Sequence, residues 1–190
     1  MGYMVHHNGE LSEEFKSTIG LLTGDTASPI LWNLYFADVI LPEDENDVTL
    51  GISHVEQADD VVLFSTTAAG LQQKLHAFFV WCGRNFMVIS VRKTKWMLFG
   101  PFPHVLPSIT VNGAAIQLVE DYKYVGIRFV STHRCIFAKH YKVKAFKARD
   151  IANATFAVEG LIGSLPPADA CILYMARVDP HLTFGAEVTK

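Results

Sequence analysis

The amino-acid sequence predicts an α+β fold in which antiparallel strand pairs alternate with helices. The dipeptides Asn8-Gly9 and Asn112-Gly113 each lie between apolar or alternating stretches, a pattern typical of two-residue hairpin turns. Apolar residues recur at helical spacing in longer segments, whereas residues 61–64, VVLF, form a short continuous apolar run typical of a strand. The expected order is therefore hairpin, helix, strands, helix, strands, helices.

The first helix is expected over residues 28–40, SPILWNLYFADVI. Ser28 is a candidate N-cap and Pro29 suits the first helical position, where its missing N–H is not needed. Residues 41–48 are expected to form an acidic loop. Residues 61–64 then read as a strand that is buried on both faces.

The second helix is predicted over residues 68–85, with an inward stripe of Leu71, Leu75, Phe78 and Cys82. A strand is expected within residues 87–100, and another over residues 122–129. The remainder reads as helical, over residues 136–161 and then, after a break at Pro166-Pro167, to about residue 178.

The composition fits a soluble globular protein of one domain, or of one domain and an appendage. The 190 residues are 50% hydrophobic and 18% charged. Their apolar runs are short and the N-terminus has no signal-peptide pattern, so no membrane association is expected. Three cysteines, Cys82, Cys135 and Cys171, lack zinc-ligand spacing and favour a reduced intracellular protein, nuclear or cytoplasmic.

Charge is strongly segregated along the chain, although the net charge is only −3. Residues 1–91 hold 3 Lys/Arg and 12 Asp/Glu, whereas residues 92–149 hold 11 Lys/Arg and 2 Asp/Glu. A basic block in an otherwise acidic protein indicates an anionic partner such as nucleic acid. An ordinary solvated helix face is the alternative interpretation.

Two adjacent acids, Asp59 and Asp60, directly precede the VVLF run. Neighbouring carboxylates repel unless a cation neutralises them, and Mg²⁺ prefers a few carboxylate oxygens with positions left for water and phosphates. Neighbours on a straight strand face opposite ways, so both acids can serve one site only at a turn or strand end. The sequence places them there. A solvated surface turn is the other interpretation.

Four blocks occur in order along the chain: GDTASPILWNLYFAD, QADDVVLFS, SVRKTKWMLFG and YKYVGIRF. Together they resemble the reverse transcriptase domain of non-LTR retrotransposons, and most of all its fungal elements, over about residues 1–180. The resemblance implies a reverse transcriptase palm of antiparallel strands with helices over residues 1–130, and a helical thumb over residues 131–190. It also implies an RNA-directed DNA polymerase that uses two Mg²⁺ ions to extend a DNA primer on an RNA template with deoxynucleoside triphosphates.

The same resemblance assigns roles around the acids. Asp59 would be the main metal ligand, with Asp60 supporting it near the primer end. Lys93 would lie near the phosphates of the nucleotide, where a cation stabilises the charge that builds on the leaving pyrophosphate. Residues near the nucleotide and template would be Thr23, Gly24, Asp25, Ser28, Pro29 and Gln57.

Primer and duplex contacts are implied further along the chain. Tyr124, Val125 and Gly126 resemble the hairpin that holds the primer. The following helix would track phosphates with basic residues, which are Lys139, Lys142, Lys144, Lys147 and Arg149. The histidines offer no metal cluster, and His133 and His140 are expected at the surface.

The sequence departs from the family pattern at several positions. Gln57 stands where an aromatic residue is usual, Thr23 where Gln is usual, and Ser90 where the lysine block has Asn. Only 23 residues precede Gly24, and none of them forms the apolar strand ending in Asp that carries the other catalytic acid. The expectation is a truncated palm and thumb that lacks an N-terminal palm or fingers segment and is inactive alone.

Two further interpretations compete with this one. The chain could be a non-catalytic nucleic-acid-binding remnant of a retroelement that uses only its basic region. It could also be an unrelated small α+β protein in which the Asp59-Asp60 pair is a surface turn. The positions of the acids and of the basic helix distinguish these cases.

Overall fold

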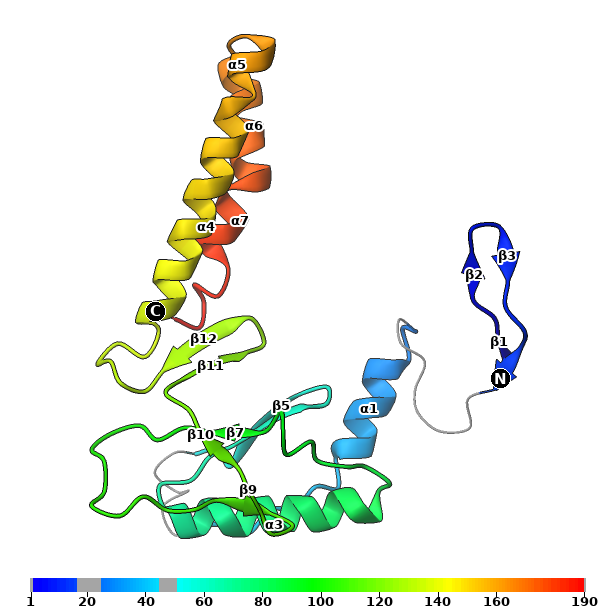
Figure 1. Ribbon diagram of the computed structural model, residues 1–190, viewed down its shortest axis with the longest axis vertical. Coiled ribbons are helices and arrows are strands. Elements are labelled where there is room, and N and C mark those ends of the chain that lie inside the picture. Colours follow the sequence, from blue (N-terminus) through cyan, green and yellow to red (C-terminus); the bar gives the residue numbers. More distant parts are fainter. Residues whose placement is uncertain (1, 17–24, 45–50, 190) are drawn as a thin grey trace. The chain divides into compact units, whose positions relative to one another are not determined.

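The computed structural model describes residues 2–16, 25–44 and 51–189 (Figure 1). The chain forms two compact units, Met1–Leu41 and Pro42–Lys190. This division does not fall at residue 130, so the expected palm and thumb boundary stays a prediction. Among the described residues, no helix has both the length and the apolar character needed to cross a membrane.

The N-terminal unit begins with short antiparallel strand pairs. Within it, β1 (Gly2–Tyr3) pairs with β4 (Phe15–Lys16), and β2 (His6–His7) pairs with β3 (Glu10–Leu11). The turn between β2 and β3 has positive φ at both central residues, 51° at Asn8 and 87° at Gly9. The hairpin predicted from this dipeptide is therefore confirmed.

Helix α1 (Ser28–Phe36) follows, with Pro29 in its first turn as expected. Ser28 is not the N-cap, because the helix begins one residue early and Ala27 precedes it. The carboxylate of Asp25 accepts a hydrogen bond from the N–H of Ala27 at 3.1 Å, and its carbonyl accepts one from Ser28 at 3.3 Å. The N–H of Leu31, which a Ser28 cap could serve, already donates to the carbonyl of Ala27 at 3.0 Å. The helix also ends at Phe36, four residues before the predicted end.

The second unit is built around helix α3 (Ala68–Arg84), which packs against β6 (Asp60–Leu63) and β8 (Thr110–Val111). The hydroxyl of Thr67 caps the helix by accepting from the N–H of Gly70. The predicted inward stripe is confirmed, since Leu75, Phe78 and Cys82 are buried and Leu71 packs against the core. The core itself contains Leu75, Ile109, Val111 and Ile116.

Strand β6 carries the first three residues of the VVLF run and, among the described residues, pairs only with β5 (His54–Gln57), in an antiparallel two-stranded sheet. The apolar residues 61–63 are half-buried, so the prediction of a strand buried on both faces is wrong. Residues 45–48 of the predicted acidic loop lie outside the described residues.

The segment after α3 contains less strand than expected. Residues 87–100 supply only β7 (Lys95–Trp96), which pairs in parallel with β10 (Gln117–Leu118). The reason is a turn in which the carbonyl of Ser90 accepts from the N–H groups of Lys93 and Thr94. The hairpin of β8 and β9 (Ala114–Ala115) is confirmed, with φ of 49° at Asn112 and 78° at Gly113.

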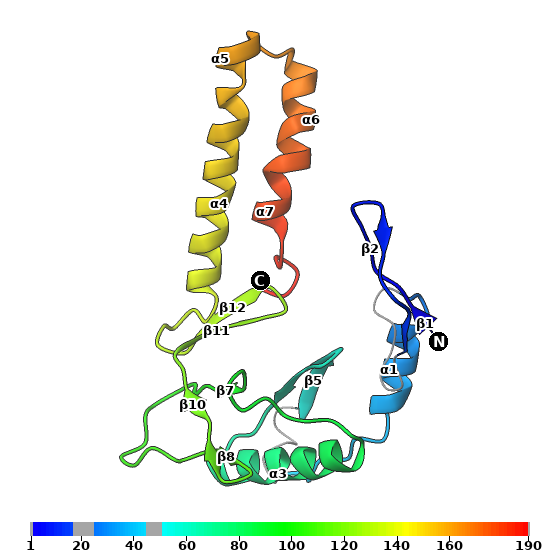
Figure 2. The same ribbon diagram turned by 45° about the vertical axis from the view of Figure 1, so that its right-hand side comes forward.

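The strand predicted over residues 122–129 is a hairpin, formed by β11 (Asp121–Tyr124) and β12 (Ile127–Val130). The rest of the chain is helical, as predicted, with a break at Pro166. Four helices are assigned there among the described residues: α4 (Ala138–Ala157), α5 (Glu159–Ile162), α6 (Pro167–Arg177) and α7 (Asp179–Thr183). Helices α6 and α7 run back alongside α4 (Figure 2).

Candidate functional site

The two acids lie at the tip of the β5–β6 hairpin. Gln57 and Asp60 close the turn as its last strand pair, and Ala58 and Asp59 form its two central residues. Ala58 has a φ of 53°, a backbone conformation that favours Gly and costs a residue with a Cβ about 1 kcal/mol. Both acidic residues are exposed, so their carboxylates are accessible to an ion or a substrate.

A second hairpin reaches the same turn. The hydroxyl of Tyr124, at the end of β11, donates a hydrogen bond of 3.1 Å to the main-chain carbonyl of Asp60. Partial burial raises the pKa of Tyr124 above its usual value, and the negative charges of Asp60 and Glu56 raise it further. The hydroxyl therefore keeps its proton and stays a donor. The bond joins the Asp-Asp block to the YVG block, which are 64 residues apart.

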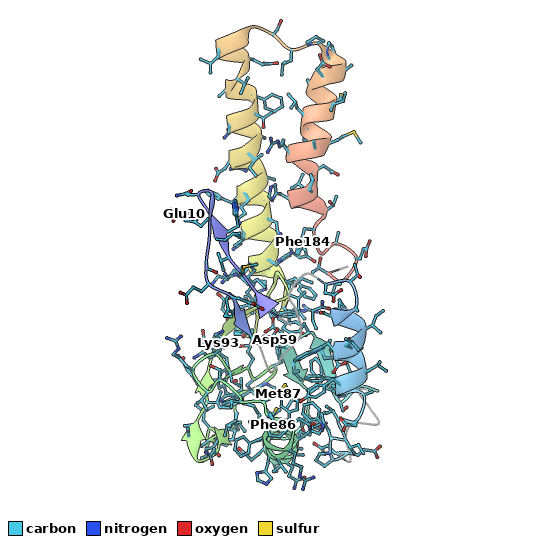
Figure 3. All side chains as sticks on the ribbon, turned by 90° about the vertical axis from the view of Figure 1, so that its right-hand side faces the viewer. Glu10, Asp59, Phe86, Met87, Lys93 and Phe184 are labelled. Carbon is cyan, nitrogen blue, oxygen red and sulfur yellow. The ribbon has the colours of Figure 1, made fainter. Side chains whose placement is uncertain are left out.

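The turn of this second hairpin is formed by Val125 and Gly126, with φ of 45° and 83°. A Cβ built on Gly126 would lie 2.7 Å from Cζ of Phe184, so the ring would have to shift to admit a side chain. The Phe184 ring also lies under the amine of Lys144, whose Nζ is 3.7 Å from the ring centroid. Figure 3 shows Phe184 where the chain leaves α7. Sequence reasoning missed Phe184, because a single aromatic after a short helix carries no distinguishing pattern.

His140 ties the same region together. The N–H of Arg128 donates to its Nδ1 at 3.3 Å, so the ring proton lies on Nε2, which donates to the carbonyl of Phe184 at 3.2 Å. The prediction of a surface histidine is wrong here, since His140 is only 3% exposed. Helical spacing places it on the inward stripe of α4 with Lys144 and Ala148. His133 is exposed, as predicted.

The five basic residues predicted to bind nucleic acid on α4 divide into two groups. Lys139 forms an ion pair with Asp121, which also accepts two hydrogen bonds from Arg128, at 3.0 and 2.8 Å. Partial burial acts to raise the pKa of Asp121, but the bonds and charges of Lys139 and Arg128 outweigh it and hold that pKa below its usual range.

Lys144 is also engaged by the protein, through the Phe184 ring. Burial lowers the pKa of its amine, and the positive charges of Lys147 and Lys123 lower it further. By contrast, Lys142, Lys147 and Arg149 are exposed, and within the described part of the chain they form no ion pair. Only these three remain fully available to an outside anion.

Lys93 lies in the turn that precedes β7 and is exposed (Figure 3). Its main-chain N–H donates to the carbonyl of Ser90 at 3.0 Å, which fixes the backbone and leaves the amine in solvent. No ion pair joins Lys93 to Asp59 or Asp60 among the described residues. Its place near a nucleotide therefore stays a prediction.

The remaining predicted nucleotide and template residues fall in different places. Thr23 and Gly24 lie outside the described residues. Ser28 and Pro29 begin α1 and Asp25 lies in the turn before it, all in the unit Met1–Leu41, whereas Gln57 is exposed beside the acid turn in the other unit. A shared site for these residues stays a prediction.

The donor set at the turn consists of two carboxylates. Across residues 2–16, 25–44 and 51–189, no group of three or more His, Cys, Asp or Glu side chains could hold a metal ion. Exposed carboxylate oxygens are the ligands that Mg²⁺ prefers, and an ion held by two of them keeps water in its other positions. Asp59 and Asp60 therefore fit part of a magnesium site.

The sequence model of the family described as "Reverse transcriptase (RNA-dependent DNA polymerase)" matches residues 2–129. Two curated relatives are described as RNA-directed DNA polymerase from mobile element jockey. The protein of Drosophila melanogaster is 25% identical and covers 66% of this chain, and that of Drosophila funebris is 26% identical and covers 57%. The matched segment spans only 15% and 13% of those two proteins. No solved structure matches.

Proposed function

Because this chain belongs to the reverse transcriptase (RNA-dependent DNA polymerase) family, we propose that Asp59 and Asp60 hold Mg²⁺ during template-directed DNA synthesis. One observation carries the proposal: the hydrogen bond from Tyr124 to the carbonyl of Asp60 joins the acid turn to the β11–β12 hairpin. In this arrangement, a metal ion held by the two acids and the end of a DNA primer held by the second hairpin would lie next to each other.

The residues around the acids have separate tasks in this proposal. Bound Mg²⁺ supplies positive charge to phosphate oxygens. Asp59 is the main ligand and Asp60 the supporting one, while Tyr124 fixes the backbone that carries them. The turn of Val125 and Gly126 supports the primer, and the Lys93 amine approaches the phosphates of the incoming deoxynucleotide. The RNA template contacts the block that contains Asp25, Ser28 and Pro29.

Complete two-metal nucleotidyl transfer needs more than these two acids. A pair of carboxylates binds one Mg²⁺ weakly and does not clamp two ions about 4 Å apart. We therefore propose that a third carboxylate comes from outside the described residues, and that these 190 residues alone support little primer extension. The narrower origin from a fungal element also stays a prediction.

Binding to a primer–template tests the metal role without requiring turnover. Mg²⁺ should tighten the binding of the chain to a recessed DNA primer on an RNA template when a matching deoxynucleoside triphosphate is present. Asp59→Ala should remove this increase and leave the Mg²⁺-independent binding unchanged. Glu187→Ala, which neutralises an exposed acid near the C-terminus, is the matched control. An increase that survives Asp59→Ala would contradict the proposal.

Primer extension tests the claim of low activity. The purified chain, with Mg²⁺ and the same primer–template, should give no cDNA above the level of Asp59→Ala. Robust synthesis that Asp59→Ala abolishes would overturn the inactivity claim and retain the role of Asp59.

A non-catalytic nucleic-acid-binding protein is the second candidate function. It is favoured by the three exposed cations Lys142, Lys147 and Arg149, which need no metal to bind phosphates. In this case, binding would fall steeply with salt, would be lost when the three are neutralised together, and would not respond to Mg²⁺ or to Asp59→Ala.

A further inference from the structure

Within the described part of the unit Pro42–Lys190, one face of α4 packs against no other helix or strand. The helix contacts α6, α7 and β12, and the side chains that are buried or half-buried on that side include His140, Lys144 and Ala148. Phe146 is 65% exposed. At 100° per residue it lies about 160° from Lys144 and Ala148, on the opposite side of the helix. The Phe146 ring is therefore not packed into the core and does not stabilise the fold by burial there.

Two cations flank this ring on the same face. Lys142 precedes Phe146 by four residues and Arg149 follows it by three, so their Cα atoms lie about 6 Å and 4.5 Å from it along the axis. Both side chains are exposed and form no ion pair within the described part of the chain. Asp150, an exposed acid, follows Phe146 by four residues and lies about 40° from it, as close as Lys142, so the two cations outnumber one acid beside the ring. The surrounding charge therefore favours a polyanion over an apolar protein partner.

We propose that Phe146 is a stacking platform for an unpaired base of single-stranded nucleic acid, whose phosphates lie along Lys142 and Arg149. This proposal rests on the nucleic-acid binding in the proposed function. It adds that the bound nucleic acid is single-stranded, and that Phe146, which is outside the predicted site, contacts it. An exposed aromatic among cations is the combination that binds single strands without reading their sequence.

A preference for single strands over duplexes follows from how bases stack. In a duplex, each base is already covered by its neighbours and offers no free face to a phenyl ring. A duplex therefore gains from Lys142 and Arg149 alone, whereas an unpaired strand gains from the ring as well. Phe146 should discriminate between the two forms, and it should do so for both RNA and DNA.

Fluorescence anisotropy with labelled oligonucleotides tests the proposal. The probes are a 12-nucleotide single-stranded RNA, a single-stranded DNA of the same sequence, and the corresponding duplex. Phe146→Leu should weaken binding to both single strands about tenfold, with duplex affinity and salt slope unchanged. Phe146→Tyr should retain most of the affinity. Because Phe146 is exposed, thermal melting of both variants should match that of the unaltered chain.

Variants that remove charge distinguish the contribution of the two cations to binding from that of the ring. The double variant Lys142→Gln and Arg149→Gln should reduce the slope of log K against log salt on single strands by about 1.4, which corresponds to two lost phosphate contacts. Asp150→Asn, a charge change on the same helix face, should strengthen binding slightly and leave the effect of Phe146→Leu intact.

Three outcomes would overturn the inference: unchanged single-strand affinity in Phe146→Leu, an equal loss on duplex, or a loss that Phe146→Tyr does not restore. Failure of the proposed function looks different. In that case Mg²⁺-dependent primer–template binding would be absent while the effect of Phe146 on single strands remained, whereas an unaltered chain that binds none of the three probes would overturn the inference as well.

Discussion

The hydroxyl of Tyr124 donates a hydrogen bond of 3.1 Å to the main-chain carbonyl of Asp60, linking the tips of two hairpins that are 64 residues apart. The same second hairpin contacts Phe184 through Gly126, and Phe184 in turn lies against His140 and Lys144 of α4. A continuous set of contacts therefore runs from the acid turn to the basic helix.

Removing the Tyr124 hydroxyl should loosen this link. Tyr124→Phe keeps the ring but deletes the donor to Asp60, and should lower the free energy of unfolding by about 0.5–1 kcal/mol. Urea denaturation measures the change. Tyr122→Phe, two residues earlier on the same strand and without such a bond among the described residues, is the control. Equal effects of both substitutions would contradict the role of the bond.

Gly126 should tolerate substitution less well than another turn glycine. Gly126→Ala places a Cβ 2.7 Å from the Phe184 ring at a φ of 83°, whereas Gly113→Ala, at a φ of 78°, meets nothing within 4 Å. Both substitutions carry a backbone cost of about 1 kcal/mol, and Gly126→Ala should cost roughly 1–2 kcal/mol more through the clash.

Thermal and urea unfolding of the two variants provide the comparison. Combining Gly126→Ala with Phe184→Ala should remove the difference, because the obstructing ring is then absent. If Gly126→Ala and Gly113→Ala destabilise the chain equally with Phe184 in place, the contact is not formed in solution.

Acid should weaken the attachment of α4 to the β11–β12 hairpin. The folded pKa of Asp121 lies below its unfolded value of about 3.9, so its contribution to stability is complete above that value. The contribution is lost as pH falls through the folded pKa, when the carboxyl gains a proton and its bonds with Lys139 and Arg128 weaken. Unfolding free energies at pH 7 and pH 3 should therefore differ less in Asp121→Asn than in the unaltered chain.

Thiol chemistry should distinguish the three cysteines. Cys82 is 3% exposed, and burial raises the pKa of its thiol to about 11, although a main-chain hydrogen bond acts in the opposite direction. Cys135 and Cys171 are exposed. A colorimetric disulfide reagent at pH 8 should titrate two thiols in the folded chain and a third only after unfolding. Rapid reaction of all three would mean that α3 does not pack as described.

Local features of the fold could be read from the sequence. The two Asn-Gly turns and the inward stripe of residues 68–85 were predictable because turn chemistry and helical periodicity act over a few residues. The strand expected over residues 122–129 failed for a related reason. Val125 has no special turn propensity, so the apolar pattern hid the turn, whereas the resemblance of the YVG block to a hairpin implied it.

Features that depend on distant contacts could not be read in this way. The burial of His140 requires Arg128 and Phe184, which are 12 and 44 residues away in the sequence. Likewise, the resemblance to a thumb helix implied five basic residues that contact phosphates, but Asp121 and Phe184 engage two of them. The position of Asp59 at a turn was predictable because an acid pair before an apolar run marks a strand end. Its function still depends on groups outside that turn.

Metal titration followed by NMR tests the central claim most directly. On addition of Mn²⁺ as a paramagnetic substitute for Mg²⁺, the amide signals of residues 58–61 and of Tyr124 should broaden first, with Mg²⁺ competing at a dissociation constant on the order of 1 mM. Asp59→Asn should abolish this local broadening. Broadening that is spread over other acidic residues, or that is unchanged in Asp59→Asn, would contradict a magnesium site at the acid turn.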